Sequence, residues 1–226
     1  MPDTTLINLI SFSTTRHNLL TRFEKNMIVT CDQNGIEIAT TAIRNGGTVV
    51  FPTDTVYGVG CDPRNPKAIQ SIFKLKKRLE DKQLPILGYS KEEIAKIAIF
   101  DDASNKIADR FWPGQVTMIL KLTDEKIQNA MKLVDKKIAV RVPNHPCALA
   151  LLSKCKLLIG TSANFSGLPA FSESKRVQEN FSGYDVFLDG GDILNSISST
   201  IVEVTKGNLR ILRQGNISKE ELASVL

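Results

Sequence analysis

The segment at residues 48–60, TVVFPTDTVYGVG, is the strongest constraint on how this chain can fold. Its first four residues are β-branched or aromatic, as in a buried strand, and Pro52 ends that strand. Two threonines, an aspartate and a tyrosine follow within five residues, before Gly58 and Gly60. Ligands of α/β proteins bind where buried strands end. The segment therefore predicts a ligand site at a strand end, with an ordinary strand-to-loop turn as the alternative.

Composition predicts a globular protein with a hydrophobic core. Of the 226 residues, 42% are hydrophobic and 23% are charged, which argues against disorder. The net charge of +5 suits anionic partners, although an excess of this size is common. No run approaches the roughly 20 apolar residues of a membrane span, so we expect no membrane association. The four cysteines and two histidines lack metal-site spacing, so we expect reduced, mostly buried thiols, a cytoplasmic location and no metal held by protein side chains.

The chain divides into two regions at Met27. Residues 1–26 are rich in Ser, Thr and Asn and carry no signal-peptide pattern. We expect a disordered extension or a misassigned start there, with an organelle transit peptide as the alternative, and we expect its deletion to leave activity intact. Residues 27–226 are expected to form one domain.

Helical and strand patterns alternate through residues 27–226. Helices are expected at 35–42, from Pro66 after the Asn65 cap, and at 91–99, 103–112, 146–153, 172–180 and after Ser218. Strands are expected at 48–51, 116–122, 138–142, 157–160, 186–188, 200–204 and 208–212, the last two as a hairpin. Crossovers combined with a hairpin predict an α/β fold with a twisted mixed sheet.

Two further segments could bind a phosphate-rich ligand. Cations gather at the end of the helix that begins at Pro66 and just beyond it, at Lys74, Lys76, Lys77, Arg78 and Lys82. They fit either a polyphosphate clamp or a solvated helix end, where the dipole favours cations. The loop GTSANFSG at 160–167 could surround an anion or be an ordinary loop. Neither the P-loop nor the dinucleotide-binding glycine pattern is present.

Arg141 and Arg213 are candidates for binding an acidic ligand. Arg141 lies in an apolar strand, so it needs either a carboxylate ligand or a structural salt bridge. Ser198, Ser199 and Thr200 precede a strand whose hairpin partner ends near Arg213. No Ser-His-Asp or Cys-His arrangement predicts covalent catalysis, and His145 is more typical of a loop or a helix cap than of a base.

In this order, these motifs resemble the YrdC family of threonylcarbamoyl-AMP synthases over about residues 35–215. The resemblance rests on PTDTVYG at 52–58, KxR at 76–78, WPG at 112–114 with Thr117, AVR at 139–141, TSANxSG at 161–167, ST at 199–200 and LRxG at 212–215. The chain is similar to the short form of the family, without the additional C-terminal domain.

The resemblance implies a single twisted α/β domain with a large, positively charged cavity. It implies a nucleotidyltransferase that forms threonylcarbamoyl-AMP and pyrophosphate from L-threonine, bicarbonate and ATP. The threonine ligands would be Thr55, Arg141 and Ser199. Lys76 and Arg78 would be catalytic, and ATP would be held by Arg78, Lys82, Thr117, Ser162, Asn164 and Arg213. Mg²⁺ would be bound mainly by ATP phosphates and water. The implied partner is the complex that modifies the tRNA adenosine beside the anticodon, and tRNA itself is a further candidate.

The sequence departs from the common pattern of the family at Leu79, Gln83, Leu87 and Ser198, and leaves the effect on activity open. Three other interpretations remain. One is a non-enzymatic module of the same fold that binds tRNA or double-stranded RNA, which an aromatic content of only 6% does little to support. The second is a carbamoyl-adenylate enzyme with another acceptor, as in hydrogenase maturation. The third is a weakly active paralogue.

Overall fold

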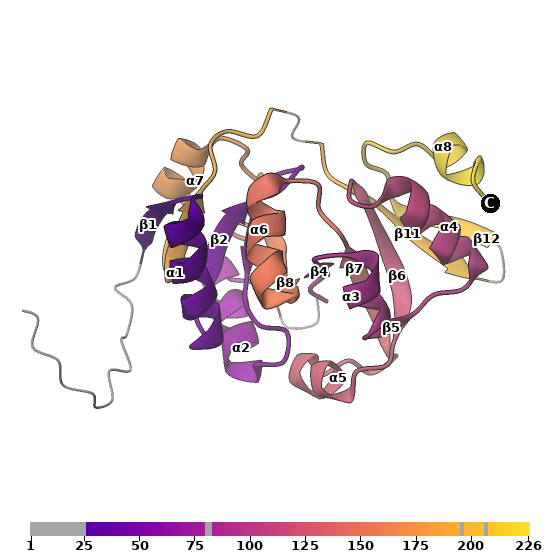
Figure 1. Ribbon diagram of the computed structural model, residues 1–226, viewed down its shortest axis with the longest axis horizontal. Helices are drawn as coiled ribbons and strands as arrows, with labels where there is room; N and C mark the ends of the chain where they lie inside the picture. The colour runs from indigo at the N-terminus through magenta and orange to yellow at the C-terminus, as the bar shows by residue number, and fades with distance from the viewer. Residues whose placement is uncertain (1–25, 80–82, 195–196, 206–207) are drawn as a thin grey trace, which may run out of the picture.

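The computed structural model describes residues 26–79, 83–194, 197–205 and 208–226 (Figure 1). The elements follow in chain order as β1 (Met27–Thr30), α1 (Gln33–Arg44), β2 (Val49–Pro52), β3 (Tyr57–Gly60), α2 (Pro66–Lys76), β4 (Ile86–Gly88), α3 (Lys91–Ala95), β5 (Ala98–Ile99), α4 (Asp102–Phe111), β6 (Val116–Leu122), α5 (Glu125–Met131), β7 (Lys137–Arg141), α6 (Pro146–Cys155), β8 (Leu157–Ile159), β9 (Thr161–Ser162), α7 (Ser174–Asn180), β10 (Val186–Asp189), β11 (Thr200–Thr205), β12 (Asn208–Arg213) and α8 (Lys219–Ala223). No helix in these ranges is both long and apolar enough to cross a membrane.

The expected mixed α/β fold is confirmed, with the strands divided between two mixed sheets. One sheet has the order β1-β10-β2-β3-β9, parallel from β1 to β2 and antiparallel from there to β9. The other has the order β12-β11-β6-β7-β4-β8, with β5 paired beside β6. In that sheet β11 and β12 form the expected antiparallel hairpin.

The two sheets join at Gly160. This residue is the only one between β8, which pairs with β4, and β9, which pairs with β3. A Cβ on Gly160 would lie 2.4 Å from Cδ1 of Leu87 in the neighbouring strand β4, so a side chain here would displace the Leu87 side chain. Strand ends from both sheets therefore meet around one point.

Local capping signals correctly predicted where several helices begin. The Asn65 side chain accepts hydrogen bonds from the amides of Lys67 and Ala68 at 3.0 and 3.2 Å, and α2 begins at Pro66. At the other end of the chain, Ser218 and Glu221 form a capping box for α8.

Two of the predicted helices are shorter than expected. The helix expected over 91–99 ends at Ala95, because Ala98 and Ile99 pair with β6 instead. The helix expected to be capped by Ser172 begins two residues later at Ser174, without a side-chain cap.

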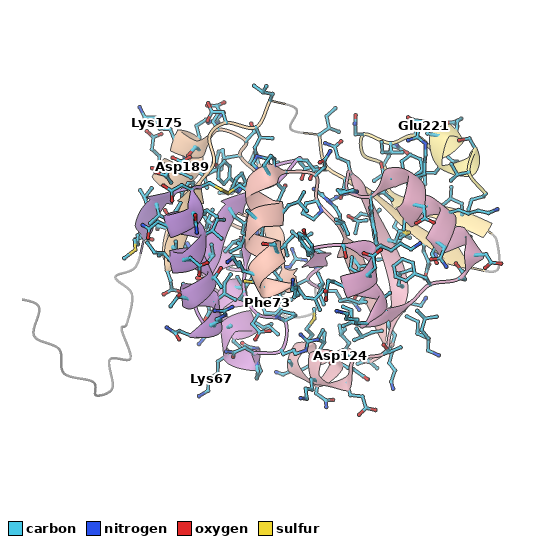
Figure 2. The ribbon with its side chains drawn as sticks, viewed as in Figure 1. Lys67, Phe73, Asp124, Lys175, Asp189 and Glu221 are labelled. Carbon is cyan, nitrogen blue, oxygen red and sulfur yellow. A yellow bond between two sulfur atoms is a disulfide. The ribbon has the colours of Figure 1, made fainter. Side chains whose placement is uncertain are left out.

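The buried hydrophobic residues form two clusters. Figure 2 labels Phe73, which packs against the larger one. The larger draws on both sheets and is flanked by partly buried side chains such as Phe73 of α2. The smaller contains Ile36 and Ile43 from α1 and Leu151 and Leu152 from α6. Accordingly, α1 and α6 lie side by side in Figure 1.

The prediction of four reduced cysteines is wrong. Cys31, after β1, and Cys147, in α6, form a disulfide, whereas Cys61 and Cys155 are free thiols. The two bonded cysteines are 116 residues apart in sequence, with their Cα atoms 6.0 Å apart. Only the packing of α1 against α6 reveals this proximity, which sequence spacing could not.

Gly60 provides a test of the junction between the sheets. A Cβ there would lie 2.2 Å from the backbone oxygen of Ile159, whereas a Cβ on Gly58 would meet Thr161 O at 3.4 Å, an ordinary contact. We expect Gly60→Ala to lower the free energy of unfolding by about 1–3 kcal/mol. Gly58→Ala, in the same strand, is the matched control with a smaller effect in urea denaturation. Equal losses from the two substitutions would contradict this account of the junction.

Candidate active site

A cavity of about 310 Å³ lies where the two sheets join. It is lined by Thr53, Thr55, Val56, Gly58, Arg78, Gln83, Pro85, Leu87, Thr117, Ala139, Arg141, Gly160, Thr161, Ser162, Ala170, Ser198, Ser199, Ile201 and Arg213. Three arginines and no carboxylate occur among these described lining residues. A lining rich in guanidinium and hydroxyl donors is suited to a ligand that carries negative charge.

The first group in the cavity centres on Arg141, at the end of β7. Its side chain is buried, and Nη2 forms an ion pair with Asp54 Oδ1. Nη1 donates to Thr55 Oγ1 at 3.3 Å, and that hydroxyl lies 3.0 Å from Thr53 Oγ1. Burial lowers the pKa of Arg141, and the charge of Asp54 opposes this shift. The sequence left open whether Arg141 meets a carboxylate ligand or a structural salt bridge. The structure contains the salt bridge, with Asp54.

The salt bridge does not use the whole guanidinium of Arg141. Its Nε has no hydrogen-bond partner among the described residues, although the atom is buried. Because an unsatisfied buried donor is costly, this atom is a candidate for receiving a ligand oxygen.

Asp54 is a residue to which the sequence analysis assigned no role. Besides pairing with Arg141, it accepts a hydrogen bond at its backbone oxygen from Gln115 Nε2 at 2.6 Å. The carboxylate was visible in the segment at 52–58, but its partner lies 87 residues further along the chain. Only the approach of β7 to the turn after β2 identifies Asp54 as the residue that holds Arg141.

The second group joins β6 to the β11–β12 hairpin. Ser199 Oγ lies 2.9 Å from Thr117 Oγ1, and Arg213 Nη2 donates to the backbone oxygen and Oγ of Ser199 at 2.9 and 3.1 Å. Burial lowers the pKa of Arg213, and the charge of Arg141 lowers it further. Two cations that disfavour each other's charged form would be stabilised by an anion bound beside them.

The third group is the loop after β9. Lys76 binds this loop through hydrogen bonds and is not among the residues that line the cavity. Lys76 is 1% exposed, and its Nζ donates to the backbone oxygen of Ser162 and to O and Oδ1 of Asn164, the last two at 2.9 and 3.2 Å. Ser162 Oγ in turn donates to Asn164 Oδ1 at 2.5 Å. Ser162 lines the cavity, whereas Lys76 and Asn164 do not. In this structure Lys76 is a positioning residue for the Ser162 loop.

Of the other predicted site residues and the positions that depart from the family pattern, most of those that the structure describes line the cavity. Arg78 lines the cavity and donates from Nη2 to the backbone oxygen of Gln83 at 3.0 Å. Lys82 lies outside the described residues. Among the departures from the family pattern, Gln83, Leu87 and Ser198 line the cavity, whereas Leu79 is 70% exposed.

Two polar residues near the motifs have structural contacts. The Tyr57 hydroxyl donates to the backbone oxygen of Gly191 at 2.7 Å, and burial raises the pKa of Tyr57 to about 12. His145 is the N-cap of α6, and its Nδ1 accepts from the amide of Cys147 at 3.2 Å. The interpretation of His145 as a helix cap is confirmed.

The buried ammonium of Lys76 predicts a pH-dependent stability. Burial, assisted by the charge of Arg78, lowers the pKa of Lys76 from 10.5 to about 7. Between these values the unfolded chain binds more protons than the folded chain, so the free energy of unfolding rises with pH across this window. We expect urea denaturation at about pH 6 and about pH 9 to show this rise in the wild type and in Lys74→Met, an exposed control in α2, but not in Lys76→Met. Equal pH slopes in all three proteins would contradict the assignment.

The fold and cavity define an α/β protein with a cavity lined by three arginines at the junction of two sheets. The Sua5/YciO/YrdC family model, described as telomere recombination, matches residues 41–215. This chain belongs to that family.

Two relatives and one solved structure illustrate the similarity. The threonylcarbamoyl-AMP synthase of Pyrococcus abyssi is 34% identical over 194 residues, which cover 84% of this chain and 57% of that protein. The threonylcarbamoyl-AMP synthase of Bacillus subtilis is 31% identical over 197 residues, covering 83% and 55%. A crystal structure of P. abyssi Sua5 complexed with L-threonine has a TM-score of 0.81 and 32% identity, covering 89% of this chain and 61% of the other. The chain thus spans just over half the length of both named synthases.

Proposed function

We propose that this chain forms L-threonylcarbamoyl-AMP and pyrophosphate from L-threonine, bicarbonate and ATP. The observation that carries the proposal is the cavity, in which Arg141 and Thr55 from one set of strand ends face the same space as Arg78, Thr117 and Arg213. The names of the similar synthases, and the threonine complex of P. abyssi Sua5, support the same reaction.

The threonine half of the cavity would be formed by Arg141, Thr55 and Ser199. The guanidinium of Arg141 would receive the threonine carboxylate, with Asp54 keeping it in place. The hydroxyls of Thr55 and Ser199 would orient the substrate. The threonine nitrogen would bond to the carbon of bicarbonate with loss of water, which gives an N-carboxylate whose oxygen can attack phosphorus.

The nucleotide half would be formed by Arg78, Thr117, Ser162 and Arg213, with Asn164 acting through the loop that Lys76 holds. The N-carboxylate oxygen would bond to the α-phosphorus of ATP while the bond to the β-phosphate breaks and pyrophosphate leaves. Such a step depends on alignment and charge neutralisation. Because the described lining offers hydroxyls but no carboxylate, it fits Mg²⁺ that arrives with ATP and keeps phosphate and water ligands.

The proposal extends to partners and location. The product would be used by a complex that transfers threonylcarbamoyl to the tRNA adenosine beside the anticodon, in the cytoplasm. No observation specifically favours the non-enzymatic RNA-binding alternative, and the named relatives are enzymes.

Pyrophosphate release tests the proposal directly. The protein is mixed with ATP, Mg²⁺ and bicarbonate, with and without L-threonine, and the nucleotide product is identified by mass. We expect release that requires threonine, together with the mass of threonylcarbamoyl-AMP. A folded protein that gives neither would overturn the synthase assignment. Serine in place of threonine is a matched control for recognition of the methyl group.

A further inference from the structure

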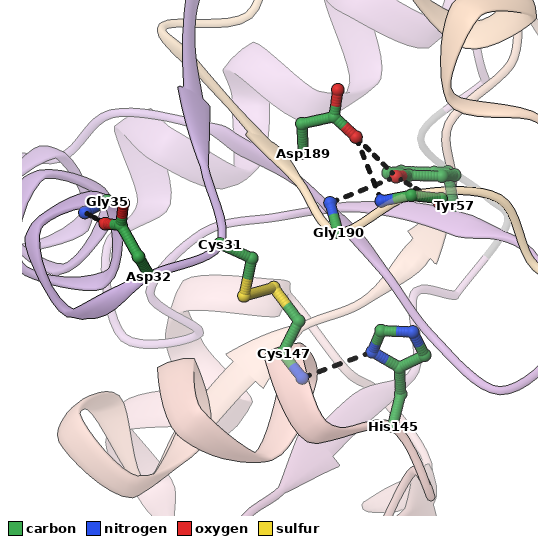
Figure 3. Close-up of a disulfide and its surroundings, with 9 residues drawn as sticks. Cys31, Asp32, Gly35, Tyr57, His145, Cys147, Asp189 and Gly190 are labelled. Carbon is green, nitrogen blue, oxygen red and sulfur yellow. Dashed lines mark hydrogen bonds between the residues drawn. A yellow bond between two sulfur atoms is a disulfide. The ribbon is translucent and has the colours of Figure 1, made fainter.

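A second cavity lies between the end of β1, the start of α6 and the segment after β10. It measures about 750 Å³, and both cysteines of the disulfide line it together with Asp32, His145, Asp189 and Gly190 (Figure 3). Cys31 is partly exposed, whereas Cys147 is 4% exposed. The disulfide is thus accessible from an open recess and lies outside the candidate active site.

We propose that the Cys31–Cys147 bond is a site of thiol–disulfide exchange with a dithiol reductant, and that its redox state controls the threonine side of the candidate active site. Disulfides of cytoplasmic proteins are commonly transient and regulatory. A reversible bond therefore accommodates both the disulfide and the cytoplasmic location that we propose. The effect on threonine rests on the proposed function, whereas the exchange reaction does not.

The surroundings of the two sulfurs favour attack at Cys31. The reductant's thiolate would bond to Sγ of Cys31, and the electron pair of the broken S–S bond would pass to Sγ of Cys147. The second thiolate of the reductant would then displace Cys31, which takes a proton from solvent. The protein gains two electrons, and the reductant becomes a disulfide.

Cys147 is the better leaving group because of its place in the fold. It is the second residue of α6, and thiolates are stabilised at helix N-termini. That end is capped by His145, whose pKa is lowered by burial, so the cap is a neutral imidazole at neutral pH. Cys31 instead precedes Asp32, whose carboxylate already caps α1 by accepting from the amide of Gly35 at 2.8 Å.

A short chain of contacts links the disulfide to Thr55. The amide of Cys31 donates to Asp189 O at 2.7 Å, and a Cβ on the next residue, Gly190, would lie 3.5 Å from Sγ of Cys147 and 2.7 Å from Cγ of Pro52. Pro52 pairs with Tyr57 across the turn that contains Thr55.

The 189–191 segment also holds the far end of this turn. The Tyr57 hydroxyl lies 3.3 Å from the Gly190 amide and donates to Gly191 O at 2.7 Å. On the opposite side, Cys147 follows Arg141 by six residues, through the segment between β7 and α6. The disulfide therefore lies beside the two segments that provide Thr55 and Arg141. The same contacts reach the Ser162 loop one step further on, because the backbone oxygen of Tyr57 accepts from the amide of Ala163 at 2.8 Å.

The exchange site is tested with a monothiol, because glutathione leaves a stable adduct at the sulfur it attacks. Oxidised full-length protein is treated briefly with reduced glutathione, quenched with acid and mapped by mass. We expect the adduct on Cys31, and the same adduct in Cys155→Ser, which removes a free thiol from the same helix. An adduct on Cys147, or reduction that occurs only in denaturant, would overturn the exchange site.

The control of the threonine side is tested by comparing oxidised protein, protein reduced with dithiothreitol, and Cys147→Ser. Reduction and the substitution are each expected to raise the KM for threonine by about threefold or more and to change the KM for ATP less, because the nucleotide half is reached only through the further contact at Ala163. Deuterium uptake at residues 52–57 is expected to rise, with α2 unaffected. Unchanged uptake and unchanged KM would overturn this control. If neither state turns over, the proposed function fails, while the uptake and adduct results still decide this inference.

Discussion

Arg141→Ala is expected to raise the KM for threonine by roughly 10- to 100-fold, because a charge-assisted hydrogen bond to the substrate carboxylate is lost. The KM for ATP should change little, since the nucleotide half is formed by other side chains. Steady-state pyrophosphate release at varied threonine measures the effect. Unchanged threonine dependence in a folded variant would refute the role of Arg141.

The same substitution also removes the partner of a buried carboxylate, so stability has to be measured alongside. Arg141→Ala leaves Asp54 unpaired, which is expected to lower the free energy of unfolding by about 3–5 kcal/mol. Adding Asp54→Asn removes the unpaired charge and should recover part of that loss without restoring the KM for threonine. Arg64→Ala is the matched control, because Arg64 pairs with Asp124 away from the cavity and is 40% exposed. This comparison separates substrate binding from folding.

Sequence patterns predicted those parts of the fold that have strong local signals. The strand Val116–Leu122 has the expected bounds because it is long and apolar, and α2 and α8 begin at their predicted caps. The short strands β1, β3, β4 and β9 were missed. Tyr57–Gly60, for example, contains two glycines and has no strand pattern of its own. Its strand geometry comes from pairing with β2, which precedes it, and with β9, which lies far along the chain. A local sequence pattern cannot reveal such pairing.

In the candidate site too, the sequence indicated individual residues but not the contacts between distant parts of the chain. Thr55 follows β2, Arg141 ends β7 and Ser199 precedes β11, and the structure places all three in the lining of one cavity. Their order along the chain could not reveal that Asp54 pairs with Arg141. Nor could it show that Lys76 turns away from the cavity to hold backbone oxygens, since side-chain direction depends on the packing of α2. The disulfide was missed for the same reason.

Arg78→Ala is expected to lower kcat/KM for ATP by about 10²- to 10³-fold, the usual cost of removing one donor that stabilises charge in a transition state. Arg78 follows the C-cap of α2 and lines the cavity, with Nη2 on the backbone oxygen of Gln83. From there its planar fork would neutralise two phosphate oxygens as pyrophosphate leaves.

Two control substitutions, Arg78→Lys and Lys77→Ala, test whether the effect on kcat/KM is specific to the guanidinium of Arg78. Arg78→Lys keeps the charge but loses the fork, so its kcat/KM should be intermediate. Lys77→Ala removes the adjacent cation, whose Nζ lies 4.9 Å from the centre of the Phe165 ring and which does not line the cavity. It should therefore behave nearly as the wild type. If Arg78→Ala retained a near-wild-type rate while folded, or if Lys77→Ala were equally impaired, general basicity would explain the site better than a phosphate clamp at Arg78.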